Sequence, residues 1–96
     1  MNNNIPTNIK DRIMLIYEIN EQECIVLVSL DNEQPLVVNM ETGVSARCLD
    51  AWTVGAYIDF KIKNVNIIYC NDDFRKLVEE CEDDMPDLCK ALKGEH

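Results

Sequence analysis

The side chains of this sequence that could do chemistry are five cysteines, one histidine and a dense run of carboxylates. The histidine, His96, is the last residue, where a general base is poorly held within hydrogen-bond reach of a substrate. The three glycines, at positions 43, 55 and 94, are too widely spaced for a phosphate-binding loop. The sequence therefore favours a protein that is not an enzyme.

Metal binding is the second chemistry that these residues could support. Cys70, Cys81, Cys89 and His96 are separated by 11, 8 and 7 residues, which matches no compact zinc spacing. The acidic residues at positions 82–84 lack the alternating ligands and the central glycine of an EF-hand loop. We therefore expect neither a metal nor a cofactor.

The cysteine pattern points to a reducing compartment. Five is an odd number, and no Cys-x-x-Cys motif occurs; Cys24 and Cys48 complete the set. A secreted disulfide scaffold normally has an even number of cysteines, whereas free cysteines in a reducing cytosol behave as small buried hydrophobes. The expected location is the cytoplasm of a bacterium or of a host cell.

The strongest pattern is an acidic run near the C-terminus. Residues 72–87 hold eight carboxylates in sixteen positions, and residues 72–96 carry −5 of the formal net charge of −9. This run is either the solvated side of an amphipathic helix or a surface that docks on a basic partner. The carboxylates that we select as candidate contacts are Glu79, Glu80, Asp83, Asp84 and Asp87.

Two aromatic residues complete the candidate partner-binding set. Trp52 is the only tryptophan, and tryptophan is enriched at the energetic centres of interfaces, although a core position is the alternative. Tyr57 lies on the polar face of a predicted strand over residues 56–63. Both are therefore candidates for contact with a partner.

The overall charge argues against two other kinds of partner. There are 18 acidic and 9 basic side chains, whereas nucleic acids and anionic membranes both require a basic surface. No segment reaches the ~18 apolar residues of a membrane span. Residues 1–7 also lack the cationic and apolar regions of a signal peptide. A basic protein surface is the partner that remains.

Hydrophobic periodicity predicts strands in the first two thirds of the chain. The expected strands cover residues 12–19, 24–30, 35–40, 56–63 and 67–70, with Gly55 as a break before the fourth. Residues 44–53 are ambiguous: Ser45 could cap a short helical turn through Leu49, or the segment could be a strand and a loop, and we favour a short helical turn or an irregular connection. Gly43 marks a turn that requires positive φ.

The last quarter of the chain reads as two short helices. The first is expected over residues 72–82, capped by Asn71 or Asp72, and its apolar stripe is Phe74, Leu77, Val78 and Cys81. Pro86 can begin a second helix, expected over residues 85–93, with Gly94 at its C-terminal cap. The buried side of the second helix is predicted to hold Met85, Leu88, Cys89 and Leu92.

Together these elements predict an α+β fold in a single domain, residues 1–96. Its parts are a β core over residues 12–70 and an acidic helical segment over residues 72–93. Five short strands with short polar turns favour an antiparallel meander or a small barrel with the helices packed on it. Residues 49–60 resemble the loop, glycine and central strand of small SH3-like and OB-like barrels, and no site residues follow from that resemblance.

The first two predicted strands are apolar on both faces, so both faces need cover. With Ile13, Leu15, Tyr17 and Ile19 on one face, the other is expected to carry Met14, Ile16, Ile25 and Leu27. The C-terminal helices could cover that second face, or it could be an interface, which leaves a homo-oligomer open.

Two functions are compatible with these observations. The first is a small non-catalytic protein-binding module, an inhibitor or adaptor that acts on a basic partner. Carboxylates one helical turn apart can imitate the phosphate spacing of a nucleic acid, as in the small acidic inhibitors that phages encode. The second is a small β-barrel that binds a ligand or single-stranded nucleic acid on a strand face with Tyr57, Lys61 and Lys63.

Overall fold

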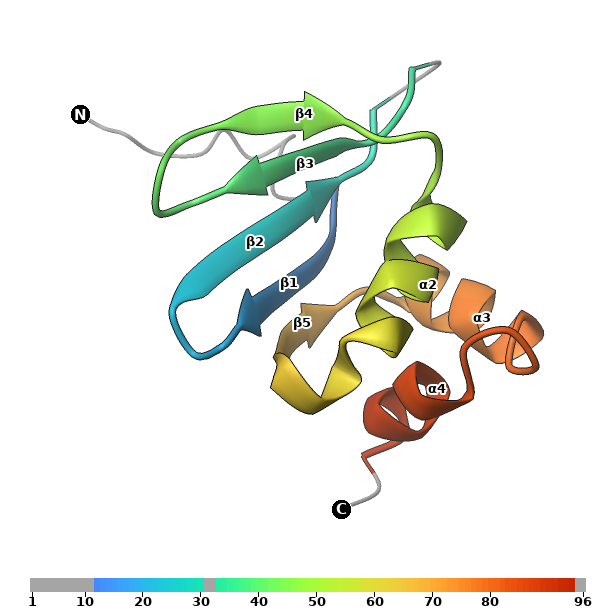
Figure 1. Cartoon of the computed structure of the whole chain (residues 1–96). Helices are drawn as coiled ribbons and strands as arrows, with labels where there is room; N and C mark the ends of the chain where they lie inside the picture. The colour runs from blue at the N-terminus through green and yellow to red at the C-terminus, as the bar shows by residue number, and fades with distance from the viewer. Residues whose placement is uncertain (1–11, 31–32, 95–96) are drawn as a thin grey trace.

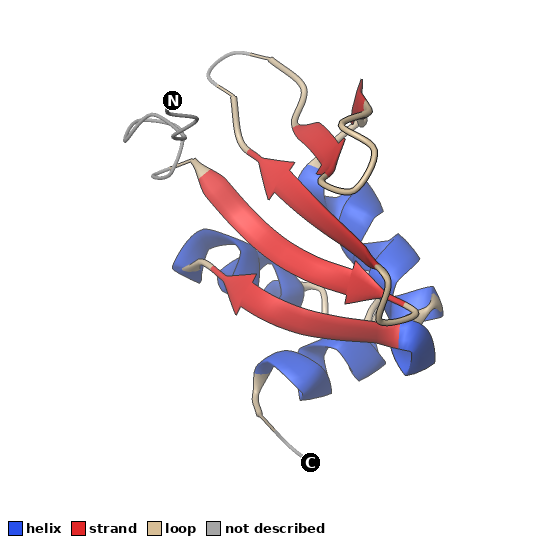
Figure 2. Ribbon diagram, turned by 90° about the vertical axis from the view of Figure 1, so that its left-hand side faces the viewer, coloured by secondary structure: helices blue, strands red, loops and turns tan. Residues whose placement is uncertain are grey.

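The computed structural model describes residues 12–30 and 33–94, in which a five-stranded antiparallel sheet carries helices on one face (Figures 1 and 2). The strands are β1 (Ile13–Ile19), β2 (Glu23–Val28), β3 (Leu36–Asn39), β4 (Ser45–Arg47) and β5 (Val65–Cys70). The helices are α2 (Ala51–Phe60), α3 (Asp72–Glu80) and α4 (Pro86–Leu92), with a 3-10 turn, η1 (Ile62–Asn64), before β5. The predicted α+β fold, a meander followed by C-terminal helices, is confirmed.

The sheet is open and does not close into a barrel, since its order is β4-β3-β2-β1-β5. The first four strands are consecutive neighbours, and the chain then crosses through α2 to add β5 beside β1. Asn20 and Glu21 have φ values of 55° and 60°, the backbone that a tight turn between β1 and β2 requires. Gly43 has a φ of 77° in the turn between β3 and β4, as expected.

The two faces of the sheet differ from the sequence prediction. Ile25 and Leu27 pair with Tyr17 and Leu15, so all four side chains lie on the face that packs against the helices. A register shift between Ile13 and Leu15 moves Met14 to that face as well. Met14, Ile25 and Leu27 therefore lie under the helices, as one alternative expected, but the predicted grouping was wrong, because Ile16 lies on the other face and Leu15 and Tyr17 share theirs. Side chains alternate between the two faces, so the grouping depends on the pairing register, which the sequence does not show.

The predicted strand over residues 56–63 is wrong, because the first half of this segment belongs to α2 and the rest to η1 and its flanks. Asp50 begins the helix: its carboxylate accepts hydrogen bonds from the Thr53 amide at 2.9 Å and from the Thr53 hydroxyl at 2.8 Å. Gly55 does not break the helix, because its missing side chain leaves room for buried Met85. Ile58 is buried, whereas Phe60 is exposed, which a period-2 pattern does not allow.

Residues 44–50 form a strand and a loop, the less favoured of the alternatives, and residues 51–53 already belong to α2. β4 pairs with β3 through Ser45, Ala46 and Arg47, so Ser45 does not cap a helical turn through Leu49. The resemblance to a barrel over residues 49–60 therefore has no counterpart in the structure. Five strands are present, but β4 replaces the strand expected over residues 56–63.

Both C-terminal helices are confirmed: α3 begins at the expected residue and ends two residues early, and α4 is one residue shorter at each end. The Asn71 side chain accepts a hydrogen bond from the Phe74 amide at 2.8 Å and caps α3. Phe74 and Val78 are buried, and Gly94 has a φ of 75° after α4. The predicted buried side of α4 is also confirmed, because it consists of Met85, Leu88, Cys89 and Leu92.

A single hydrophobic core lies between the sheet and the three helices. Its fully buried members come from both layers: Leu15 and Leu27 from the sheet, and Ile58, Phe74 and Leu88 from the helices. Burial of one such side chain contributes about 1.5–3 kcal/mol. The helices therefore cover one face of the sheet, as one of the two sequence alternatives required.

Candidate functional site

Helix α4 is attached to α2 by one carboxylate. Asp59, in the last turn of α2, accepts hydrogen bonds from the amides of Asp87 and Leu88, at 2.8 and 2.9 Å. Next to this contact, a Cβ at Gly55 would lie only 2.8 Å from the Met85 sulfur, so the chain that enters α4 lies directly against α2. The sequence did not indicate this role for Asp59, because its partners lie 28 and 29 residues away along the chain.

Helix α3 is attached to the C-terminal end of α4. The Arg75 guanidinium donates a hydrogen bond to the Leu92 carbonyl at the end of α4. Lys93 and Glu82 form an ion pair at 4.0 Å between the end of α4 and the turn after α3. The acidic segment is thus part of the folded helical layer (Figure 1).

The structure places all five predicted carboxylates at the surface but not on one face. Glu79 and Glu80 follow each other in α3, so they point about 100° apart on its outer side. Asp83 and Asp84 lie in the turn that leads into Met85, and Asp87 lies in the first turn of α4, where its amide contacts Asp59 of α2. None of the five forms an ion pair with another of the described residues.

The two predicted aromatic residues lie on α2, at opposite borders of its exposed side. The exposed fractions are 40% for Trp52 and 47% for Tyr57. Trp52 therefore lies at the surface and outside the core cluster. Tyr57 lies near Tyr17 of β1 and Cys48; burial first, and then Tyr57 and Cys48, raise the pKa of Tyr17 to about 12.

Phe60 is an exposed residue that the sequence prediction missed, with 81% of its surface accessible. In the predicted strand it shared the inward face with Ala56 and Ile58. In the helix it follows Trp52 and Ala56 at intervals of four residues, which places these three side chains along one line. We call Trp52, Ala56 and Phe60 the aromatic stripe; a helical interpretation of this segment would have revealed it.

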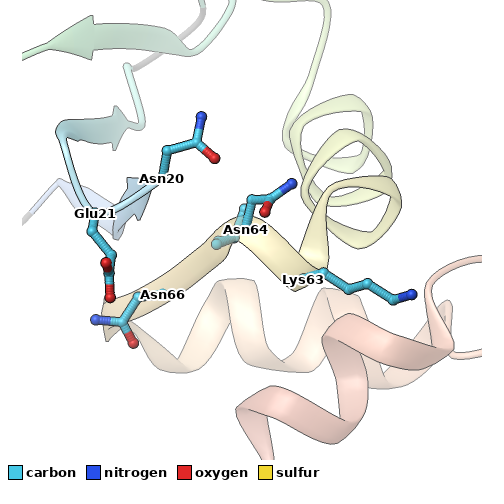
Figure 3. Close-up of a pocket in the computed structure, with 6 residues that line it drawn as sticks. Asn20, Glu21, Lys63, Asn64 and Asn66 are labelled. Carbon is cyan, nitrogen blue, oxygen red and sulfur yellow. The ribbon is translucent and has the colours of Figure 1, made fainter.

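The strand face that the second hypothesis requires is not present. Tyr57 belongs to α2, Lys61 ends that helix and Lys63 lies in η1. Lys63 also lines an open pocket of about 410 Å³ with Asn20, Glu21, Asn64, Val65 and Asn66 (Figure 3). Its side chain points away from Glu21 and Asn66 (Figure 3), so the pocket does not converge on a cationic group.

The face of the sheet opposite the helices is apolar and uncovered by any helix of the described chain (Figure 2). The cross-strand pairs align its side chains in rows: Ile13, Ile16, Val26, Val28, Leu36, Val38 and Tyr69. Val26 and Val28 are buried, while Tyr69 is 45% exposed. The interface that the sequence left open as an alternative stays a prediction; of the four residues expected on such a face, only Ile16 lies on this one.

All five cysteines are free thiols, and they do not form a cluster that could bind a metal ion. Within residues 12–30 and 33–94, no three histidine, cysteine or acidic side chains gather in a way that could hold a metal ion. Burial raises the pKa of the thiols of Cys24, Cys48 and Cys70, which favours their protonated form. His96, the fourth residue of the zinc pattern, lies outside the described residues, as do residues 1–7.

Comparison with known proteins does not extend this picture. No protein-family model matches the chain, and neither a curated protein nor a solved structure matches it. In the part of the chain that the structure describes, no helix has the length and apolar character to cross a membrane.

Proposed function

We propose that this protein is a small, non-catalytic protein-binding module that docks its acidic helical surface on a basic protein partner. We define the acidic surface as Glu79, Glu80, Asp83, Asp84 and Asp87. The observation that carries the proposal is that these carboxylates are exposed, yet belong to a segment whose helices are attached to the fold.

The way in which the segment is held supports binding. A flexible acidic tail would lose conformational entropy on binding, which weakens association. Here Asp59 holds the start of α4, Arg75 holds its end, and Asn71 caps α3, so the charges are already positioned. None of the five carboxylates forms an ion pair with another described residue, and together they raise the local negative potential, which speeds encounter with a basic surface.

The partner that fits this charge is a protein whose own ligand is an anion. A basic groove that accepts nucleic acid would attract these carboxylates for the same physical reason that it attracts phosphates. In that case the module acts as an inhibitor, or as an adaptor when the partner's own site stays open. The five free thiols, three of them with a pKa raised by burial, favour a reducing, cytoplasmic location.

The test is capture of basic proteins from host lysate by the immobilised protein at two salt concentrations. The variant Asp83→Asn/Asp84→Asn removes two charges from the acidic surface. The control Glu21→Gln/Glu41→Gln removes two charges from exposed turns of the sheet. We expect the first variant to lose most of the captured partner at low salt, the control to retain it, and high salt to weaken capture by the unmodified protein.

Two results would contradict the proposal. If both variants reduced capture equally, net charge alone would explain the binding and the acidic surface would have no special role. If capture by the unmodified protein did not change with salt, and neither variant reduced it, docking would not be electrostatic.

A further inference from the structure

The exposed side of α2 carries almost no charge. In a chain with 28% charged residues, α2 holds a single charged side chain, Asp59, and that carboxylate is occupied with the amides of α4. The residues that face solvent instead include Trp52 and Phe60, at 40% and 81% exposure. A large exposed aromatic side chain is typical of a surface that is covered by a partner.

The geometry of the aromatic stripe is that of a straight ridge. Trp52, Ala56 and Phe60 are separated by four residues each, so the stripe runs along α2 for about 12 Å. Ala56, between the two large residues, has a small side chain. Ridges with a spacing of four residues are those that pack into the grooves of a second helix.

The carboxylates lie along one border of this ridge. The hydrogen bonds of Asp59 and the contact between Gly55 and Met85 place the first turn of α4 against α2. Gly55 directly precedes Ala56 in the sequence, and Asp59 directly precedes Phe60. At 100° per residue, both lie on the side of the stripe that is nearer to Trp52 than to Tyr57. The turn with Asp83 and Asp84 leads directly into this contact, so these two carboxylates and Asp87 lie on the α4 side of the stripe, whereas Tyr57 lies on its other side.

We propose that the aromatic stripe and its acidic border together bind a cationic amphipathic helix of the partner protein. The apolar side of that helix packs on Trp52 and Phe60, and its lysine or arginine side faces Asp83, Asp84 and Asp87. Charge complementarity selects this occupant: an apolar helix would leave the carboxylates unpaired, and a purely basic segment would leave the aromatic residues exposed. The inference rests on the proposed function and specifies the recognition element of the basic partner.

The test compares two synthetic peptides that have the same composition of leucine and lysine. Each has about 18 residues, which is long enough to form a helix on binding. One has leucines at the i, i+3, i+4, i+7 positions of an amphipathic helix; the other is scrambled. Trp52 is the only tryptophan of the chain, so its fluorescence reports binding to the unmodified protein, and calorimetry gives the affinity of the variants.

We expect the amphipathic peptide to bind at least about fivefold more tightly than the scrambled one. Phe60→Ala should weaken binding by about tenfold. Asp83→Asn/Asp84→Asn should weaken it by a comparable factor at low salt and much less at high salt. The matched control is Tyr69→Ala, which removes another exposed aromatic side chain from the opposite layer, and it should leave the affinity unchanged.

Each contrary result has a distinct meaning. Equal, salt-sensitive binding of the two peptides, unaffected by Phe60→Ala, would overturn the inference and leave the proposed electrostatic docking intact. Binding that depended on Phe60 but not on Asp83 and Asp84 would show an apolar partner and would contradict both proposals. Binding of neither peptide would overturn the inference, while capture from lysate would still decide the proposed function.

Discussion

Helices α2 and α3 belong to the same layer, but they use their aromatic residues in opposite ways. Phe74 of α3 is completely buried, and the exposed side of that helix carries charged residues. Phe60 of α2 is 81% exposed, and the exposed side of α2 has almost no charge. In α3 the aromatic side chain is needed for the core, so folding alone explains the hydrophobic pattern. In α2 an aromatic side chain remains outside the core, so the helix has more apolar surface than folding requires. The excess in α2 is what suggests binding.

The largest expected effect separates these two phenylalanines. Phe74→Ala leaves a cavity in the core and should cost about 3–5 kcal/mol of unfolding free energy. Phe60→Ala removes an exposed ring and should change stability by no more than about 0.5 kcal/mol. Chemical denaturation of both variants measures the difference. Similar losses in the two variants would mean that Phe60 belongs to the core.

The contact between α2 and α4 can be tested at Gly55. Gly55→Val introduces a Cβ 2.8 Å from the Met85 sulfur and should cost about 1–3 kcal/mol because it overpacks the core. Gly55→Ala should cost less, since alanine regains about 1 kcal/mol of helix propensity. A thermal or denaturant midpoint for Gly55→Val above that of the unmodified protein would contradict the close approach of the two helices.

The cap that Asp59 provides for α4 should have a smaller effect. Asp59→Ala leaves the amides of Asp87 and Leu88 without their acceptor and should cost about 1–2 kcal/mol. Amide exchange in α4 should accelerate more than in α3, which is capped by its own Asn71. Asp84→Ala, which removes an exposed carboxylate nearby, is the control and should leave both properties unchanged.

Tyr17 of β1, which lies near Tyr57 of α2, should make the stability of the protein depend on pH in the alkaline range. Burial, together with Tyr57 and Cys48, raises the pKa of Tyr17 to about 12 in the folded protein, against about 10 in an unfolded chain. The folded state therefore holds the phenol proton more tightly, and this stability is lost as the pH rises from about 10 toward 12. Tyr17→Phe should make the loss over this range shallower, whereas Tyr69→Phe should not. Equal slopes in the two variants would contradict the shift.

The sequence was sufficient to predict α3 and α4, because their signals are local. Asn71, the spacing of Phe74 and Val78, and Gly94 lie within or beside the elements that they define. Residues 56–63 also have a local signal, the period-2 pattern of a strand, but this signal misleads. Their helix is stabilised by contacts with residues elsewhere in the chain. Gly55 is compatible with α2 because Met85, thirty positions further along the chain, fills the space beside it.

The candidate site was predictable only in part, because it also depends on contacts between residues that are far apart in the sequence. The exposure of the acidic residues and of Trp52 agrees with the sequence-based selection. Phe60 was assigned to the wrong side once its segment was taken as a strand, and the role of Asp59 depends on a contact between distant helices. Which carboxylates lie beside an aromatic residue is a property of helix packing, and periodicity carries no information about it.

The most direct test of the binding surface is a nuclear magnetic resonance titration of isotope-labelled protein with the amphipathic leucine–lysine peptide. We predict that amide shift changes concentrate in α2 and in residues 82–88, with small changes in β2 and β3. Changes centred on the open face of the sheet, at Val26, Val28 and Val38, would contradict the assignment and would place the binding surface on the opposite layer.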